Sequence, residues 1–269
     1  MIRLPDVSLS AGALAWLAEL QQAVDAEPTY AQQVEAGKRL FEAKRGLVGF
    51  RPVLTALKRM CSGAQRCCYC EDSQATDAEH IKPKDFYPGL VFAWENYLFA
   101  CARCNRPKSN TCDIHRQDDG ARLKVPAFVR QHKRPPPAGD AVLINPRLED
   151  PLELMMLEMR DTFFFLPRAA PDTRDWERAR HTIDLLKLNE EDVLPKSRAE
   201  AYAGYRDRLK RYVDQKARGE PPEALRHTVT SLHQMRHPTV WHEMKRQRAF
   251  PHHQEINRLF TAAPEALDW

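Results

Sequence analysis

Long hydrophobic runs are absent from this 269-residue chain, and glycine is scarce. No stretch approaches the ~18 consecutive apolar residues that a membrane-spanning helix needs, and the start, Met1 to Pro5, lacks the basic and apolar regions of a secretory signal. The low glycine content, 10 against 20 prolines, and the 43% hydrophobic fraction exclude fibrous and disordered classes. We therefore expect a cytoplasmic, globular protein that is rich in helix and has no membrane partner.

Cysteine occurs seven times, an odd number that does not suit a disulfide framework. Four of the seven fall into two CxxC pairs, a spacing typical of metal binding in a reducing compartment. The net charge of +4 permits a polyanionic partner without requiring one. Basic residues cluster at 196–218 and at 245–248, and for each cluster a solvated helix face is a better explanation than contact with nucleic acid.

Hydrophobic spacing and turn formers divide the chain into four predicted parts. These are an N-terminal helical segment (1–66), a cysteine-containing core (67–133), a Pro-rich connector (134–140) and a mostly helical C-terminal region with a short strand pair (141–269). Helical periodicity and capping residues predict the first helices over 10–24, 30–40 and 52–60. The predicted strand pair joins AVLINP, residues 141–146, to TFFFLP, residues 162–167.

The two CxxC pairs are spaced to hold one metal ion. Cys67, Cys70, Cys101 and Cys104 supply the four thiolates of a closed tetrahedral zinc site, which has no open position and is therefore structural. Cys68 is an alternative to Cys67, but the CxxC spacing of Cys67 is the commoner one. The competing interpretation is a set of buried cysteines without metal, and it suffices for the three cysteines outside the pairs.

A polar pair follows the first CxxC. EHIKP is predicted to form a short strand on which Glu79 and His80 point to opposite sides, unless the strand ends or bulges there. Because four thiolates fill the coordination sphere of zinc, His80 is free for chemistry.

A short helix is predicted at the second CxxC. Cys101, Cys104, Asn105 and Lys108 stand at i, i+3, i+4 and i+7, so a helix that begins near Cys104 aligns them along one side. Pro107 is tolerated only in the first turn of that helix.

In order, these features are CxxC, an acid-His pair with an apolar residue and Pro, an Asn, and CxxCNxxK. They resemble the HNH nucleases, or ββα-metal endonucleases, in their zinc-knuckle form. A wider resemblance is to PtuB-type nucleases of Septu and retron antiphage systems, and it covers about residues 55–210 through CCYCE, EHIKPK, WENYLFACARCNRPKSN, LINP and TIDLLKLNEEDVLPKSR. The resemblance implies an α+β fold, mostly α, with a small zinc-stabilised ββα-metal core flanked by N- and C-terminal helical segments.

The resemblance also implies residue roles in a metal-dependent endonuclease that hydrolyses phosphodiester bonds, with DNA expected in preference to RNA. His80 would be the general base, while Glu79 and Asn105 would hold a catalytic Mg²⁺ or Mn²⁺. Asn96 would brace the loop beside His80, although a plain turn residue explains it equally well. Contacts to phosphates are expected from Lys82, Lys84 and Lys108.

An ABC-type ATPase that controls the nuclease is the implied partner. Trp176 and Trp241 could belong to its docking surface, but a place in the core is favoured for both. His233 and His237 are interpreted as surface residues. The alternatives to an enzyme are a non-catalytic zinc-knuckle module that binds nucleic acid and a protein that only docks onto an ATPase. Pure binding does not require an acid beside a histidine at metal-ready spacing, which argues against the first.

Overall fold

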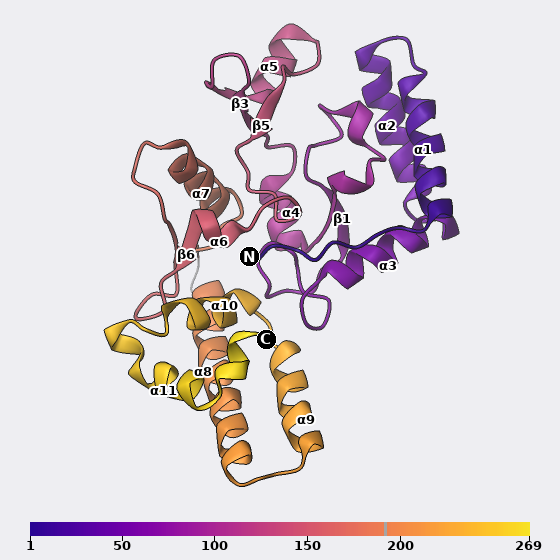
Figure 1. Ribbon diagram of the computed structural model, residues 1–269. Helices are drawn as coiled ribbons and strands as arrows, with labels where there is room; N and C mark the ends of the chain where they lie inside the picture. The colour runs from indigo at the N-terminus through magenta and orange to yellow at the C-terminus, as the bar shows by residue number, and fades with distance from the viewer. Residues whose placement is uncertain (191–192) are drawn as a thin grey trace.

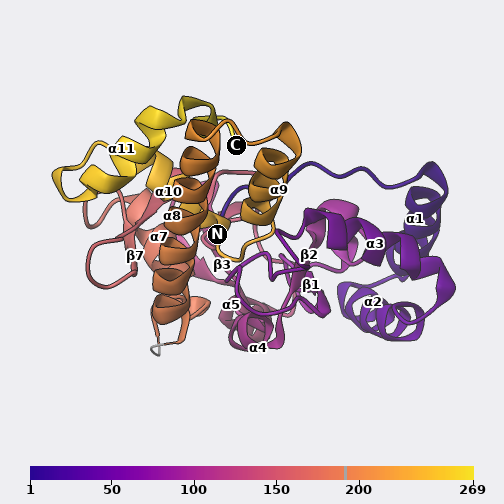
Figure 2. The same cartoon turned by 90° about the horizontal axis from the view of Figure 1, so that it is seen from below.

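A computed structural model describes residues 1–190 and 193–269 of the chain. The fold is α+β and mostly helical, with three small antiparallel sheets among the described residues. Figures 1 and 2 show the N-terminal and C-terminal helices at opposite ends of the molecule, with strands β1 and β2 and helix α4 between them. No helix in the described ranges is long and apolar enough to cross a membrane.

Three helices precede the cysteines, as predicted: α1 (Ala11–Asp25), α2 (Tyr30–Lys44) and α3 (Arg51–Met60). The side chains of Ser10 and Thr29 accept hydrogen bonds from the first turns of α1 and α2, and Pro52 occupies the first turn of α3, where its missing N–H costs nothing. Helices α1 and α2 pack against each other and enclose one side of the segment that carries His80.

The middle of the chain contains a β-β-α unit. Strand β1 (Asp77–His80) pairs antiparallel with β2 (Tyr97–Ala100), and α4 (Ala102–Lys108) follows directly. Helix α4 begins two residues before Cys104, within the predicted range. Pro107, however, lies in the second turn rather than the first; the helix ends one residue later, so the missing N–H removes only one hydrogen bond.

A small module follows α4 and lies above it in Figure 1. It comprises β3 (Asp113–Arg116), β4 (Arg122–Lys124), α5 (Val125–His132) and β5 (Gly139–Ala141), with strand order β4-β3-β5. Gly139 ends the Pro-rich segment inside β5, and a Cβ atom there would lie 2.5 Å from the carbonyl oxygen of His115, so only glycine allows this close pairing. The module has its own apolar cluster around Ile114 and Val125.

The C-terminal region begins with α6 (Pro151–Leu154), β6 (Met155–Leu157), β7 (Phe165–Pro167) and α7 (Arg174–Leu185). The predicted partnership of residues 141–146 with 162–167 is wrong, because β7 pairs with β6 and Ala141 pairs with Ile114 of β3. A turn over 158–164 makes the β6-β7 hairpin local, whereas the predicted pair needed a longer connection.

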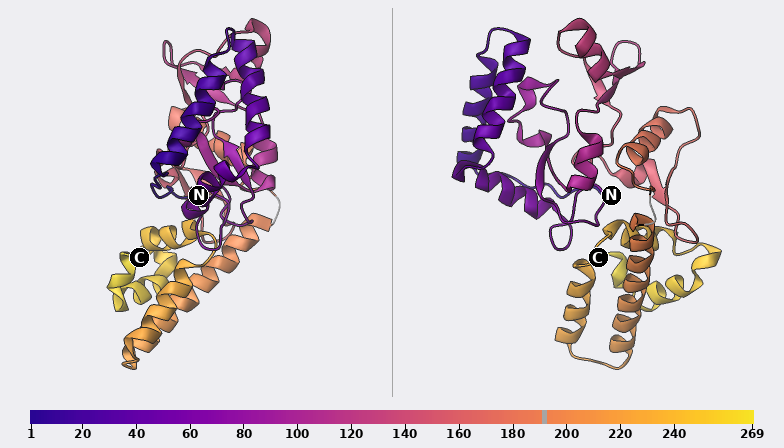
Figure 3. Two further views of the ribbon diagram at one scale, coloured as in Figure 1. Left: turned by 90° about the vertical axis from the view of Figure 1, so that its right-hand side faces the viewer. Right: turned by 180° about the vertical axis from the view of Figure 1, so that it is seen from behind.

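Helices complete the chain: α8 (Val193–Ala217), α9 (Pro222–His233), α10 (Pro238–Gln247) and α11 (Gln254–Ala262). Figure 3 shows α8 and α9 projecting from the rest as a hairpin. Trp241 is buried, as the core interpretation expects, and stacks on Tyr205. Single 3-10 turns occur at Val48–Phe50, Pro88–Leu90, Trp94–Asn96, Pro251–His253 and Pro264–Leu267.

The loop after Cys70 joins the middle of the chain to the C-terminal helices. Glu71 accepts hydrogen bonds from the backbone N–H (3.1 Å) and hydroxyl (3.0 Å) of Thr239, and Asp72 accepts one from Ser197 (2.6 Å). His237 lies 3.2 Å from the same Asp72 carboxylate and is 1% exposed, so its interpretation as a surface residue is wrong. Its side-chain partners Asp72 and Ser197 are 165 and 40 positions away in sequence, which is why its local pattern does not reveal its burial.

Candidate metal centre and active site

The four paired cysteines meet in one buried cluster. The sulfur atoms of Cys67, Cys70, Cys101 and Cys104 all lie within 4.8 Å of one another, and the Sγ atoms of Cys70 and Cys101 are 3.8 Å apart. A tetrahedron with Zn–S bonds of about 2.3 Å has edges of about 3.8 Å. The cluster therefore has the donor set and the dimensions to bind a zinc ion, and Cys67 rather than Cys68 is the member from the first pair.

The cluster is held by the β1-β2 hairpin. Cys101 follows β2 and is the N-cap residue of α4, so Cys104 lies one helical turn further on. The first pair is docked on the same strand, because the backbone N–H of Cys68 donates to the carbonyl of Phe99 at 3.0 Å. A hydrogen bond between Cys104 and Cys101 raises the pKa of the Cys104 thiol and lowers that of Cys101, as expected when packed thiols share protons.

His80 lies at the end of β1 with one ring nitrogen fixed. Its Nε2 is 2.9 Å from the carbonyl oxygen of Val91, which can only accept, so Nε2 carries the proton. Phe41 and Tyr97 pack against the ring at 4.5 and 5.0 Å between centroids. Burial among these rings lowers the pKa of His80 to about 3, so the imidazole is neutral at pH 7. Nδ1 is then the basic nitrogen, and no group in the described ranges hydrogen-bonds to it.

Glu79 is buried and already has two partners. Its carboxylate forms an ion pair with the ammonium of Lys108 and accepts a 2.9 Å hydrogen bond from the hydroxyl of Tyr69. Lys108 is fully enclosed and donates a second hydrogen bond, 2.7 Å long, to the carbonyl of His80. Contact between Lys108 and a phosphate therefore requires that its ammonium leave Glu79 and reach solvent.

Asp77 is a polar residue of the site that the sequence analysis did not select. The side chain of Asn105 donates a hydrogen bond to its carboxylate at 3.3 Å. Asp77 and Glu79 are two positions apart, and strand periodicity places both on one face of β1. The predicted strand began at Glu79 and so did not include Asp77; a start two residues earlier, with the same alternation of faces, was the signal that could have identified it.

A polar cavity of about 450 Å³ brings these groups together. All four residues of β1 line it, with Asn105 on its α4 side and Phe41 on its α2 side. Strand β1 pairs only with β2 among the described strands, so its other edge is open and side chains from both faces reach this space. Lys84 also lines the cavity, with its ammonium 5.7 Å from the Phe41 ring.

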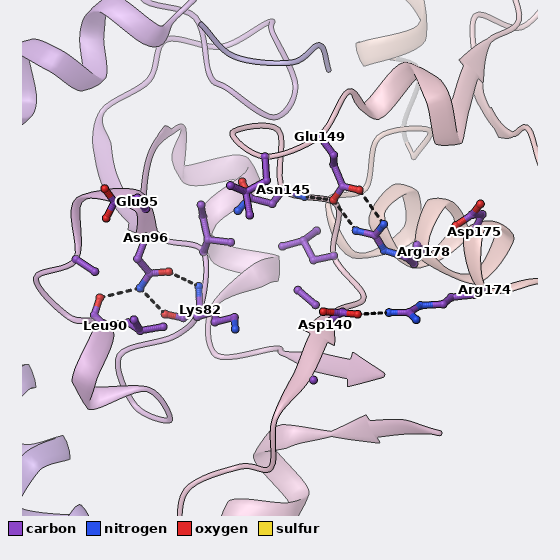
Figure 4. Close-up of a pocket in the computed structure, with 16 residues that line it drawn as sticks. Lys82, Leu90, Glu95, Asn96, Asp140, Asn145, Glu149, Arg174, Asp175 and Arg178 are labelled. Carbon is purple, nitrogen blue, oxygen red and sulfur yellow. Dashed lines mark hydrogen bonds and ion pairs between the residues drawn. The ribbon is translucent and has the colours of Figure 1, made fainter. Parts of the chain in front are cut away.

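Asn96 joins the loop after His80 to the start of β2. Its side-chain oxygen accepts from the backbone N–H of Lys82 at 2.8 Å, and its amide nitrogen donates to the carbonyls of Lys82 and Leu90 at 3.0 and 2.9 Å (Figure 4). Asn96 thus fixes the loop without entering the His80 cavity. Its position is next to a different cavity, which Lys82 also lines.

This second cavity is the larger one, about 740 Å³, and lies between the Asn96 loop and α7 (Figure 4). Its charged walls are largely neutralised by ion pairs of Asp140 with Arg174 and of Glu149 with Arg178. Glu79 and His80 of β1 and Asn105 of α4 line the smaller cavity instead. The smaller cavity is therefore the candidate active site.

Fold and site together define a mostly helical α+β protein with a four-cysteine cluster that could bind zinc. No protein-family model matches the chain. The chain is 32% identical over 128 residues to the Septu protein PtuB of Bacillus mycoides (strain KBAB4). The matched region covers 41% of this chain and 39% of that protein. The chain is also 46% identical over 48 residues to the Septu protein PtuB of Bacillus thuringiensis, or 16% of this chain and 19% of that one. The chain spans less than half the length of these relatives, and the similarity supports a PtuB-like protein.

Proposed function

We propose that the protein is a metal-dependent endonuclease of the HNH type that hydrolyses phosphodiester bonds of DNA. The observation that carries the proposal is the neutral His80, whose Nε2–H is held by Val91 and whose Nδ1 is left without a partner in a cavity shared with Asp77 and Asn105. An imidazole fixed in this tautomer can accept a proton at Nδ1 from an attacking water. The low pKa keeps it in the required unprotonated form.

Hard oxygen ligands for Mg²⁺ or Mn²⁺ are available in the same cavity. When bound there, the ion would offset the charge that develops on the phosphate and the leaving oxygen. Asn105 is a ligand on this proposal, and Asp77 is its neighbour within hydrogen-bond distance. The family resemblance assigns Glu79 as a ligand, but its carboxylate can bind the metal ion only after the ion pair with Lys108 is broken. The cysteine cluster would hold zinc as a structural ion that fixes β2 and α4.

The similarity to Septu PtuB proteins supports a role in antiphage defence. We extend this to a nuclease effector that acts in the cytoplasm with an ABC-type ATPase partner. Co-expression with an ABC-type ATPase from the same genome, followed by affinity purification, would test the partnership. Recovery of a stoichiometric complex supports it, and separate elution of the two proteins under all nucleotide conditions contradicts it.

The enzyme itself is tested on supercoiled plasmid and on RNA, with Mg²⁺, Mn²⁺ or EDTA. Wild type, His80→Ala and the exposed control His227→Ala are compared after equal zinc content has been verified. Metal-dependent cleavage of plasmid by wild type and His227→Ala, with none by His80→Ala, is the expected result. Cleavage that survives His80→Ala would exclude His80 as the base.

A second candidate function is a zinc-knuckle protein that binds nucleic acid or an ATPase without catalysis. The ion pair of Glu79 with Lys108 favours it, because the pair satisfies a carboxylate that a metal would otherwise use. Inactivity of wild type with every metal, both alone and with its ATPase, would favour this candidate.

A further inference from the structure

A third cavity, which is also polar and is called the extension below, adjoins the candidate active site. It has a volume of about 560 Å³ and shares two lining residues, Ser109 and Asn110, with the cavity of His80. These residues form the turn that leaves α4, and the side chain of Asn110 donates a hydrogen bond to Asp85. The two cavities therefore adjoin at this turn, and together they are called the groove below.

The net charge of the lining side chains differs between the two cavities. The cavity of His80 is lined by three carboxylates and three cationic side chains, so its net charge is zero. The extension is lined by three cationic side chains, Arg122, Lys124 and Arg130, against the single carboxylate of Asp113, a net charge of +2. Asp113 is already paired with Arg122. Lys124 and Arg130 are exposed and have no ion-pair partner in the described ranges.

One hydrogen-bond donor in the extension has no acceptor. His181 lines the cavity, and its Nδ1 is 2.9 Å from the guanidinium of Arg122, which can only donate. Its Nε2 therefore carries a proton, and among described residues this buried N–H has no partner.

We propose that this extension holds the phosphate backbone of DNA beside the scissile bond, with Lys124 and Arg130 as phosphate contacts. The proposal rests on the nuclease function, since the extension adjoins the cavity of His80. The cavity of His80, whose lining has no net charge, suits the metal-dependent step. The extension, whose lining has a net charge of +2, suits a DNA strand, which carries one negative charge per nucleotide. The module of β3, β4 and α5 would thus fix the register of the strand.

Binding is tested separately from cleavage, with full-length protein and a fluorescein-labelled 20-base-pair DNA duplex in EDTA. The double variant K124A/R130A is compared with R211A/R258A, which removes two exposed cations from α8 and α11 and changes the net charge equally. Loss of two phosphate contacts is expected to weaken binding about tenfold and to lower the slope of log K against log salt by about 2, with the control unchanged. Ala127→Lys, which adds a cation to the same wall, should tighten binding.

Equal affinity of K124A/R130A and wild type for the DNA duplex would overturn the proposal. So would the absence of DNA binding by wild type, or the finding that Lys124 and Arg130 contribute only to the binding of a matched RNA duplex. Plasmid cleavage with Mg²⁺ is measured in parallel. Cleavage by wild type without any effect of K124A/R130A on binding would leave the nuclease function intact and reject the groove, so the two failures are distinguishable.

Discussion

The ammonium of Lys108 and the carboxylate of Glu79 form an ion pair in which neither side chain is more than 3% exposed. The pair ties the last turn of α4 to β1, and Lys108 also holds the carbonyl of His80. A buried pair of this kind contributes little net stability compared with apolar residues, but loss of one partner leaves an uncompensated charge.

Lys108→Met is therefore expected to lower the free energy of unfolding by about 3–5 kcal/mol, because the buried Glu79 loses its counter-charge. The double variant E79Q/K108M removes both charges and should recover most of this loss. Urea denaturation of wild type, both single variants and the double variant measures the coupling. Additive losses in the double variant would mean that the pair is not coupled in solution.

Zinc removal is expected to unfold the middle of the chain. Structural zinc sites bind with apparent free energies of about 10–16 kcal/mol, which equals or exceeds the stability of a typical domain. Cys101→Ser should lose the metal, which elemental analysis measures, and should melt at a much lower temperature. Cys112→Ala is the matched control, because Cys112 is buried outside the cluster. Equal zinc content in Cys101→Ser and wild type would reject the four-thiolate site.

Asn96→Ala should destabilise the loop that follows His80. The substitution removes three hydrogen bonds and leaves backbone groups of Lys82 and Leu90 without their partner, a loss of about 3 kcal/mol. Urea denaturation measures it, with the exposed Asn257→Ala as control. If both variants unfold at the same urea concentration as wild type, Asn96 does not brace this loop.

Glu158 predicts a specific dependence of stability on pH. Burial opposes its ionisation, but hydrogen bonds from Thr162, Arg160 and Asp161 outweigh this and lower its pKa to about 2. Because the folded pKa lies below the unfolded value of 4.5, the stabilisation is complete above pH 4.5 and is lost as pH falls toward 2. The residue is partly exposed, so we expect only about 1 kcal/mol after solvent screening.

Glu158→Gln should thus be less stable than wild type by a constant amount between pH 5 and 8, and the difference should shrink below pH 4.5. Urea denaturation across this range provides the measurement. A difference that grows as the pH falls would contradict the sign of the pKa shift.

The sequence was informative wherever the deciding interactions are local. A serine cap at Ser8 or Ser10, the apolar spacing of residues 30–40 and the position of Pro52 predicted the N-terminal helices, and CxxC spacing selected Cys67 over Cys68. These features depend on residues within a few positions of one another, where chain geometry leaves few choices.

The sequence analysis did not predict features that depend on residues far apart in the chain. The burial of Lys108 depends on Glu79, 29 positions earlier, and that of His237 depends on Asp72 and Ser197. The partner of Phe165–Pro167 was misassigned because residues 141–146 have the composition of a strand, but only Ala141 belongs to one, the last residue of β5, and 142–146 continue without strand pairing. Composition describes what a segment can form, whereas pairing is decided by which segment is nearest in the folded chain.

The loop of Glu71 and Asp72 has a practical consequence for anyone who wishes to study the cysteine core in isolation. A fragment of residues 67–133 would retain both carboxylates while losing Thr239, Ser197 and His237, the groups that satisfy them. Water would replace these groups as the partner of both carboxylates, so the loop that directly follows Cys70 would lose the contacts that fix it. Excision of the core would therefore loosen the segment that carries one of its four candidate metal ligands.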